Sequence, residues 1–164
     1  MRSSGTTEPS LISCPRRAPT RALFLLPHES DGPMPIDATK RYQRVLVAED
    51  HPGMSAAIRR LVAADDFDVV GSVEDGARVL EEAARLQPDI IILDLNMPNK
   101  NGIDACRELT HTLPRTRTIV VTAEDPVHVR PAALAAGAFA FVEKRAIHTD
   151  LLPAVRSACH ELAA

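Results

Sequence analysis

Short apolar runs alternate with longer amphipathic segments from residue 44 onward, and this alternation constrains the fold more than any other feature. The apolar runs predict strands at 44–48, 67–71, 90–93, 118–121 and 139–142. The amphipathic segments predict helices at about 53–64, 75–86, 102–112, 127–136 and 149–162. Five strand–helix units indicate an open, doubly wound α/β fold, in which helices cover both faces of a parallel sheet. An eight-unit barrel would need many more residues.

Local signals set several boundaries of these elements. Pro52 suits the first turn of a helix, Pro88 stops the next helix, and Gly137 favours a helix C-cap. Pro131 lies inside the predicted helix 127–136, where it has no N–H to donate and crowds the preceding turn. We therefore predict that this helix starts late, is kinked, or is irregular up to Pro131.

Residues 1–40 differ in composition from the rest of the chain. They hold six of the 13 prolines and show no sustained periodicity. Such a segment buries too little apolar surface to offset the entropy of ordering it. We expect residues 1–40 to be a disordered N-terminal leader or extension. As an alternative, translation starts at Met34 and residues 1–33 are not part of the protein. Residues 41–164 are expected to form one domain.

Composition also excludes several classes of protein. A net charge of −3, from 19 basic and 22 acidic residues, argues against direct nucleic-acid binding. The three cysteines are too widely spaced for a disulfide framework or a paired-cysteine metal site, which favours a reducing cytoplasm. No apolar stretch approaches the roughly 20 residues that a membrane span requires. We expect a cytoplasmic protein that binds neither nucleic acid nor a membrane.

Polar residues whose side chains can bind ligands or react follow four of the five predicted strands. They are Glu49, Asp50, Asp94, Thr122 and Lys144. Because the carboxyl ends of parallel strands meet at one edge of a sheet, where such folds bind ligands, these side chains are expected to lie together.

Each of these residues also has an ordinary structural explanation, as a helix cap, a turn residue, a strand-end hydroxyl or an exposed lysine. As a group they are harder to explain that way, since like charges in one crevice destabilise a fold unless a cation or a function compensates. Three carboxylates without His or Cys favour Mg²⁺, with Mn²⁺ as an alternative, over zinc. A carboxylate beside an ammonium and a hydroxyl can accept a phosphoryl group.

Four stretches together resemble the receiver domain of bacterial two-component response regulators. They are RVLVAED (Arg44 to Asp50), DIIILDLNMPNKNG (Asp89 to Gly102), IVVTA (Ile119 to Ala123) and AGAFAFVEK (Ala136 to Lys144). The similarity covers about residues 42–163, and the following His51-Pro52 pair is similar to the subgroup joined to LuxR-type DNA-binding domains. The resemblance implies a flavodoxin-like or CheY-like sheet with the strand order 2-1-3-4-5.

The resemblance also implies the chemistry of the site. Asp94 would accept a phosphoryl group from a phosphohistidine, carried by a sensor histidine kinase or a histidine phosphotransfer protein. Asp50, Asp94 and the backbone carbonyl of Asn96 would bind Mg²⁺ directly, and Glu49 would bind it through a water.

A switch is implied as well. Thr122 and Lys144 would contact the phosphoryl group, and Phe141 would turn inward once Thr122 moves. The surface built from segments 127–136, 139–142 and 149–162 would then change for a partner. Arg145 stands where many receivers have a proline; we expect a trans bond before it, because a cis bond there would cost about 3–4 kcal/mol.

Only 20 residues follow Lys144, which leaves room for one helix. We therefore expect a single-domain switch rather than an enzyme, acting on a downstream protein target, through a homodimer or in a phosphate relay. One alternative is a phosphatase of the haloacid dehalogenase type, but its Asp-x-Asp motif follows the first strand, whereas Asp94 follows the third and Asn96 replaces the second acid. A docking scaffold independent of phosphorylation is another alternative.

Overall fold

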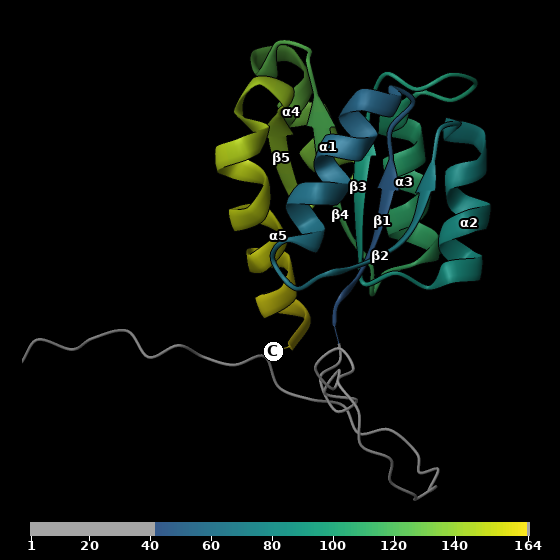
Figure 1. The fold of residues 1–164 in the computed structure, drawn as a ribbon. Helices are drawn as coiled ribbons and strands as arrows, with labels where there is room; N and C mark the ends of the chain where they lie inside the picture. Colours follow the sequence, from purple (N-terminus) through teal and green to yellow (C-terminus); the bar gives the residue numbers. More distant parts are fainter. Residues whose placement is uncertain (1–41, 164) are drawn as a thin grey trace, which may run out of the picture.

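A computed structural model describes residues 42–163, so the predicted leader at residues 1–40 lies outside the described residues (Figure 1). The strands are β1 (Arg44–Ala48), β2 (Asp68–Val73), β3 (Ile90–Asp94), β4 (Arg117–Thr122) and β5 (Ala140–Glu143). The helices are α1 (Pro52–Ala63), α2 (Val79–Leu86), α3 (Gly102–Thr112), α4 (Pro126–Ala135) and α5 (Ile147–Ala163). Two short 3₁₀ turns, η1 (Gly76–Arg78) and η2 (Lys144–Ala146), precede α2 and α5.

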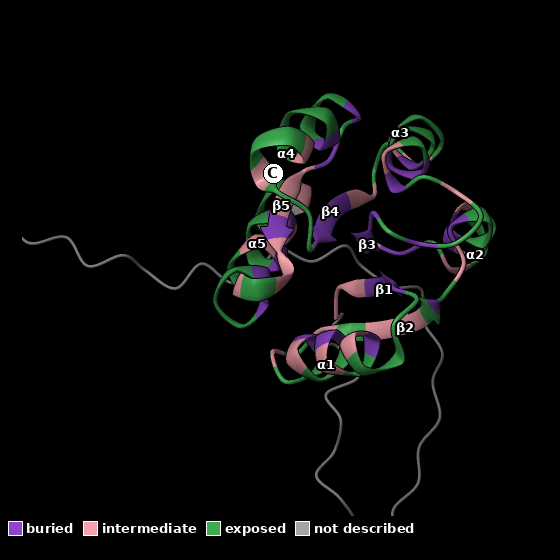
Figure 2. Cartoon of the chain, turned by 90° about the horizontal axis from the view of Figure 1, so that it is seen from above, coloured by how far each residue is buried: buried purple, intermediate pink, exposed green. Residues whose placement is uncertain are grey.

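The five strands form one parallel sheet in the order β2-β1-β3-β4-β5, which confirms the predicted fold. Helices α1 and α5 cover one face, and α2, α3 and α4 cover the other (Figure 2). This is the two-sided cover that parallel strands require. None of the helices in residues 42–163 is long and apolar enough to cross a membrane.

The central strand β3 is buried along its whole length. Ile90 and Ile92 belong to the core beneath α1 and α5, whereas Ile91 and Leu93 belong to the core beneath α2, α3 and α4. This alternation explains why the strand is a continuous apolar run, since both of its faces need apolar side chains. Each such side chain contributes roughly 1.5–3 kcal/mol through burial.

Most helix boundaries agree with the local signals in the sequence. Pro52 is the first residue of α1, where the missing N–H costs nothing. Gln87 ends α2 with a left-handed φ of 48°, and Gly137 follows α4 with a φ of 94°. β2 runs two residues further than expected, to Val73, because its pairing with β1 continues to the end of that strand.

Of the three alternatives predicted for this helix, a late start and an irregular course up to Pro131 are wrong, and a kink at Pro131 stays a prediction. The helix begins at Pro126 and continues through Pro131. Asp125 caps it by accepting a hydrogen bond of 2.9 Å from the Val127 N–H, and the N–H groups of His128 and Val129 bond to the Asp125 carbonyl. The first turn is therefore complete before Pro131, which removes one backbone donor only.

α5 begins at Ile147, two residues earlier than predicted, and contains Pro153 as the predicted segment does. The bond between Lys144 and Arg145 is trans, as expected, since the described residues contain no cis peptide bond.

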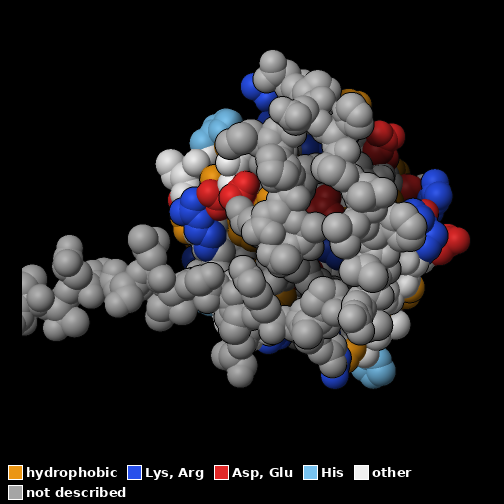
Figure 3. Space-filling model, turned by 60° about the horizontal axis from the view of Figure 1, so that its bottom comes forward, with side chains coloured by type: hydrophobic (Ala, Val, Ile, Leu, Met, Phe, Trp, Pro, Cys, Tyr) orange, Lys and Arg blue, Asp and Glu red, His pale blue; other side chains and the backbone are white. Residues whose placement is uncertain are grey.

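The lower face of the molecule, at the amino ends of the strands, carries charges of both signs. Where side chains are visible in Figure 3, both basic (Lys, Arg) and acidic (Asp, Glu) residues lie around the rim.

Candidate functional site

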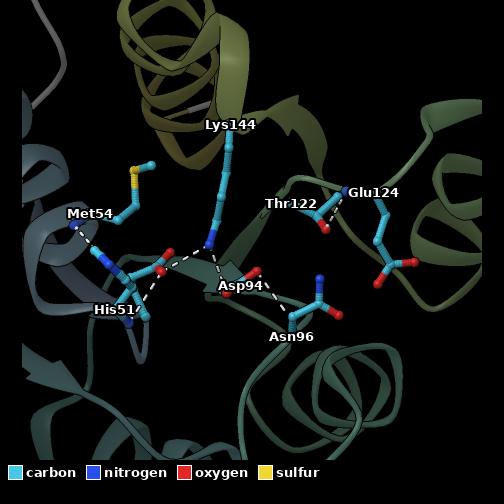
Figure 4. A network of polar contacts seen from close by, with 8 residues as sticks. His51, Met54, Asp94, Asn96, Thr122, Glu124 and Lys144 are labelled. Atoms are coloured by element: carbon cyan, nitrogen blue, oxygen red, sulfur yellow. Dashed lines mark hydrogen bonds and ion pairs between the residues drawn. The ribbon is translucent and has the colours of Figure 1, made fainter.

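Strand register brings the predicted site residues to one edge of the sheet. Ala48 of β1 pairs with Leu93 of β3, so the residues that follow them, Glu49 and Asp94, lie side by side. Asp94 itself pairs with Val121 of β4, one residue before Thr122. Figure 2 looks down on this edge, and Figure 4 shows the polar side chains that meet there.

Three carboxylates form the acidic part of the site. One oxygen each from Glu49, Asp50 and Asp94 lie within 4.8 Å of one another. Glu49 and Asp94 are buried, with 0% and 1% of their surface exposed, whereas Asp50 is exposed. The cluster is thus open to solvent on the side of Asp50 and closed beneath.

Lys144 supplies the positive charge. It comes from η2, directly after β5, and its Nζ lies 2.9 Å from Glu49 Oε1 and 2.8 Å from Asp94 Oδ2. Burial lowers the pKa of this ammonium, but the hydrogen bonds and charges of Asp94 and Glu49 outweigh that effect and raise the pKa above its ordinary value. Lys144 is therefore charged at neutral pH and bridges the ends of β1 and β3.

Glu49 is the most constrained acid in the cluster. Burial raises the pKa of its carboxyl above the ordinary value and the charge of Asp94 adds to this, while Lys144 and the His51 N–H act in the opposite direction. Its Oε1 accepts from Lys144, but its buried Oε2 has no hydrogen-bond partner within residues 42–163. Such an atom usually has a ligand or a water as its partner.

The charges at this edge do not balance. Three carboxylates and one ammonium sum to −2, which one divalent cation would neutralise. All of the candidate ligand atoms are oxygens, and hard oxygen ligands are those that Mg²⁺ and Mn²⁺ prefer. The residues present therefore fit a divalent metal ion of this kind.

The loop after β3 orients the Asp94 carboxylate. The Asn96 N–H donates to Asp94 Oδ1 at 3.2 Å, so each carboxylate oxygen of Asp94 accepts one hydrogen bond. The start of α3 packs tightly under this loop: a Cβ on Gly102 would lie 2.4 Å from Leu95 Cα. Glycine is the residue that permits this approach.

Thr122 and Phe141 belong to β4 and β5, the strands on the far side of β3 from β1. Thr122 is fully buried at the end of β4, and its Oγ1 accepts a hydrogen bond of 3.2 Å from the Glu124 N–H (Figure 4). Phe141 is half-buried on β5 and packs against the core beneath α4. Neither side chain takes part in the Lys144 bridge.

A pocket of about 550 Å³ lies next to these residues. It is formed by the loop between β4 and α4 and by the end of β5 with η2, and its lining includes Thr122, Asp125, Val127, Glu143, Lys144 and Arg145. Thr122 and Lys144 thus border both the acidic cluster and this pocket.

His51 caps α1, with Nδ1 accepting from the Met54 N–H at 3.2 Å. Two contacts of the site were not anticipated from the sequence. One joins the His51 N–H to Glu49 Oε1 at 3.4 Å. Asp75, far away in sequence, contacts the loop that follows β3 through Asn99. The sequence predicts that residues 75–76 begin a helix, and nothing in it indicates that they meet the loop after β3.

Comparison with known proteins is consistent with this arrangement. The family model described as the response regulator receiver domain matches residues 45–156. The response regulator GacA of Pseudomonas viridiflava is 35% identical over 116 residues, a match that covers 69% of this chain and 53% of the relative. The chain thus spans about half the length of the curated relatives it matches first.

Solved structures agree in fold. The response regulator domain of Thermotoga maritima CheB is 32% identical, with a TM-score of 0.67 over 73% of this chain and 97% of that one. A LuxR-family two-component response regulator from Aurantimonas sp. SI85-9A1 is 24% identical, with a TM-score of 0.70 over 74% of this chain and 87% of that one, and shows the fold alone.

Proposed function

The chain belongs to the response regulator receiver domain family, and from that premise we propose that it is a phosphoacceptor switch with Asp94 as the acceptor. The observation that supports this most strongly is the setting of Asp94. It lies buried at the carboxyl end of the central strand, accepts a hydrogen bond from Lys144, and lies next to two further carboxylates. The donor would be a phosphohistidine on a sensor histidine kinase or a histidine phosphotransfer protein.

The reaction would transfer one phosphoryl group. A carboxylate oxygen of Asp94 forms a bond to phosphorus while the P–N bond of the phosphohistidine breaks, and the imidazole leaves with the electron pair. Little covalent chemistry is required of the protein, because phosphoryl transfer depends on positioning and charge stabilisation. Lys144, 2.8 Å from Asp94 Oδ2, is placed to bind the phosphoryl oxygens as a point charge.

The acidic cluster would hold Mg²⁺, or Mn²⁺ in its place. Asp50, Asp94 and the Asn96 carbonyl would bind it directly, and Glu49 would do so through a water. The orphaned Glu49 Oε2 and the −2 charge of the cluster support this assignment. When bound, the metal ion neutralises charge on the transferred phosphoryl group.

The output would be a change of surface. Thr122 would leave the Glu124 N–H to bind the phosphoryl group, and Phe141 would follow it inward. The face formed by α4, β5 and α5 would then bind a downstream protein or a second copy of the chain, in the cytoplasm. Exposed apolar side chains support this choice of face: among the described residues, Val127 and Leu134 are the large hydrophobic residues with high exposure, 74% and 46%, and both belong to α4.

Intact-mass measurement tests the proposal. The full chain is incubated with Mg²⁺ and acetyl phosphate, and wild type is expected to gain one phosphoryl group. Asp94→Ala should gain none, whereas Asp104→Ala, which removes an exposed acid of α3, should gain one like wild type. Labelling of the Asp94→Ala variant to the same extent as wild type, or no labelling of wild type, would refute the assignment.

A further inference from the structure

Two loops that are distant in sequence are joined beside the site. Asp75 caps the η1 turn, with Oδ1 accepting from the Ala77 N–H at 2.8 Å. Its second oxygen, Oδ2, accepts a hydrogen bond of 2.9 Å from Asn99 Nδ2, in the loop between β3 and α3. Capping requires one carboxylate oxygen only, so the second hydrogen bond needs a separate explanation.

The backbones of the two loops are also in contact. The Gly76 N–H donates to the Pro98 carbonyl at 3.2 Å. A Cβ on Gly76 would lie 2.9 Å from the Lys100 carbonyl oxygen, so no larger residue fits without a shift of the loop. Asn99 has a left-handed φ of 67°, a conformation that Asn and Gly adopt more readily than other residues.

The loop that receives these contacts is the loop that orients Asp94. It leaves the sheet at Leu95, and its second residue, Asn96, donates its N–H to Asp94 Oδ1. It returns at Gly102, whose N–H bonds to the Leu95 carbonyl at 3.2 Å. The span between these two ends is held from outside by Asp75 and Gly76.

We propose that Asp75 and Asn99 are positioning residues for phosphoryl transfer: their hydrogen bond holds the loop from which Asn96 orients the Asp94 carboxylate. The proposal rests on the proposed function of Asp94. The bond itself is exposed, so it adds little to the stability of the fold. A small displacement of a reacting group can nevertheless slow a reaction about a hundredfold.

Substitutions at the two positions distinguish the effect of losing the hydrogen bond from the effect of changing either residue. Asn99→Asp places two carboxylates opposite each other and breaks the bond, while Asp tolerates the left-handed backbone. Asn99→Gly breaks it without adding a charge. Asp75→Asn is the matched control, because the Asn99 amide can turn and accept from the new amide. In the double variant Asp75→Asn/Asn99→Asp, the bond and the wild-type net charge are both restored.

The experiment measures the rate of phosphorylation by acetyl phosphate, at a Mg²⁺ concentration shown to be saturating for each variant, together with the thermal unfolding midpoint. Asn99→Asp and Asn99→Gly are each expected to react about tenfold more slowly than wild type, with an unchanged midpoint. Asp75→Asn and the double variant are expected to react within about twofold of wild type.

The outcomes distinguish this proposal from the one it rests on. If wild type itself is not phosphorylated on Asp94, the proposed function fails. If wild type is phosphorylated and both Asn99 variants react at its rate, the positioning role is overturned while the function of Asp94 stands. A double variant that stays as slow as Asn99→Asp overturns it equally, since the restored hydrogen bond would then have no effect on the rate.

Discussion

Lys144 is the cation that stabilises the acidic cluster, and replacing it with methionine tests the contribution of that charge to stability. Methionine keeps most of the volume of the side chain and removes the ammonium. In the variant, Glu49 and Asp94, both almost fully buried, lose the donor that lies 2.9 Å and 2.8 Å from their oxygens.

The expected cost follows from the environment of the two ion pairs. Removing one partner of a buried ion pair costs about 3–5 kcal/mol. Here the Lys144 side chain is 16% exposed, and the cluster is open to solvent at Asp50, so we expect a smaller loss of about 2–3 kcal/mol at pH 7 without metal. Asn96 N–H, which still bonds to Asp94, limits the loss further.

The loss should depend on pH in a defined direction. The pKa of Glu49 in the folded protein is raised, so the folded state binds its proton more tightly than the unfolded state does. The stability that protonated Glu49 contributes is present below its unfolded pKa and is lost as pH rises through its folded pKa. Without Lys144, which lowers this pKa in the wild type, the destabilisation should be larger at pH 7 than near pH 5.

Urea unfolding measures this, with EDTA or with excess Mg²⁺ present. We expect Lys144→Met to lower the urea midpoint without changing the slope, and Mg²⁺ to stabilise the variant more than it stabilises wild type. Arg107→Met, which breaks an exposed ion pair with Asp104, is the control and should change stability by less than about 0.5 kcal/mol. A Lys144→Met variant as stable as this control, at pH 7 in EDTA, would refute the reasoning.

Three further predictions concern other parts of the molecule. Asp50→Asn, which removes the exposed carboxylate of the cluster, should weaken Mg²⁺ binding in isothermal titration calorimetry by at least about tenfold, with no loss of stability in EDTA. Burial raises the pKa of the Cys106 thiol to about 11. With the other two cysteines replaced by serine, the native protein should therefore resist a thiol reagent at pH 8. Its stability should decline between about pH 9 and 11, because the unfolded thiol ionises before the folded one. Gly137→Ala should lower the free energy of unfolding by about 2–3 kcal/mol in urea, because φ is 94° and the new Cβ would lie 2.5 Å from Thr110 Cγ2.

The convergence of the candidate site residues could be predicted from the sequence because it depends on one general property of parallel sheets. The apolar runs fix where β1, β3 and β4 end, and their register then places Glu49, Asp94 and Thr122 at the same level. No knowledge of side-chain packing is needed for that step. The same logic predicts that Lys144, which follows β5, reaches the cluster, as its two ion pairs show.

Features that depend on contacts between loops could not be predicted in this way. The bond between Asp75 and Asn99 joins residues 24 positions apart, and neither turn sequence encodes its partner. The course of α4 through Pro131 was missed for a different reason. A proline rule applied to one residue leaves out the Asp125 cap and Pro126, which form the first turn independently of Pro131.

Charge at the site also explains why phosphorylation and the movement of Thr122 would be linked. The cluster carries −2, so a bound divalent cation brings it to neutrality. Phosphorylation of Asp94 removes one carboxylate charge and adds a phosphoryl group of about −1.5 to −2, a net change of about −0.5 to −1. Lys144 has three N–H donors, of which Glu49 and Asp94 accept two, so it offers the three phosphoryl oxygens too few donors by itself and a further donor is needed. Thr122 has a hydroxyl at the end of the neighbouring strand. Within residues 42–163, the hydrogen bond to its Oγ1 comes from the Glu124 N–H. Exchange of that single bond for one to the phosphoryl group would draw the loop between β4 and α4 toward Asp94, which is how a charge change at one atom would reach the surface of α4.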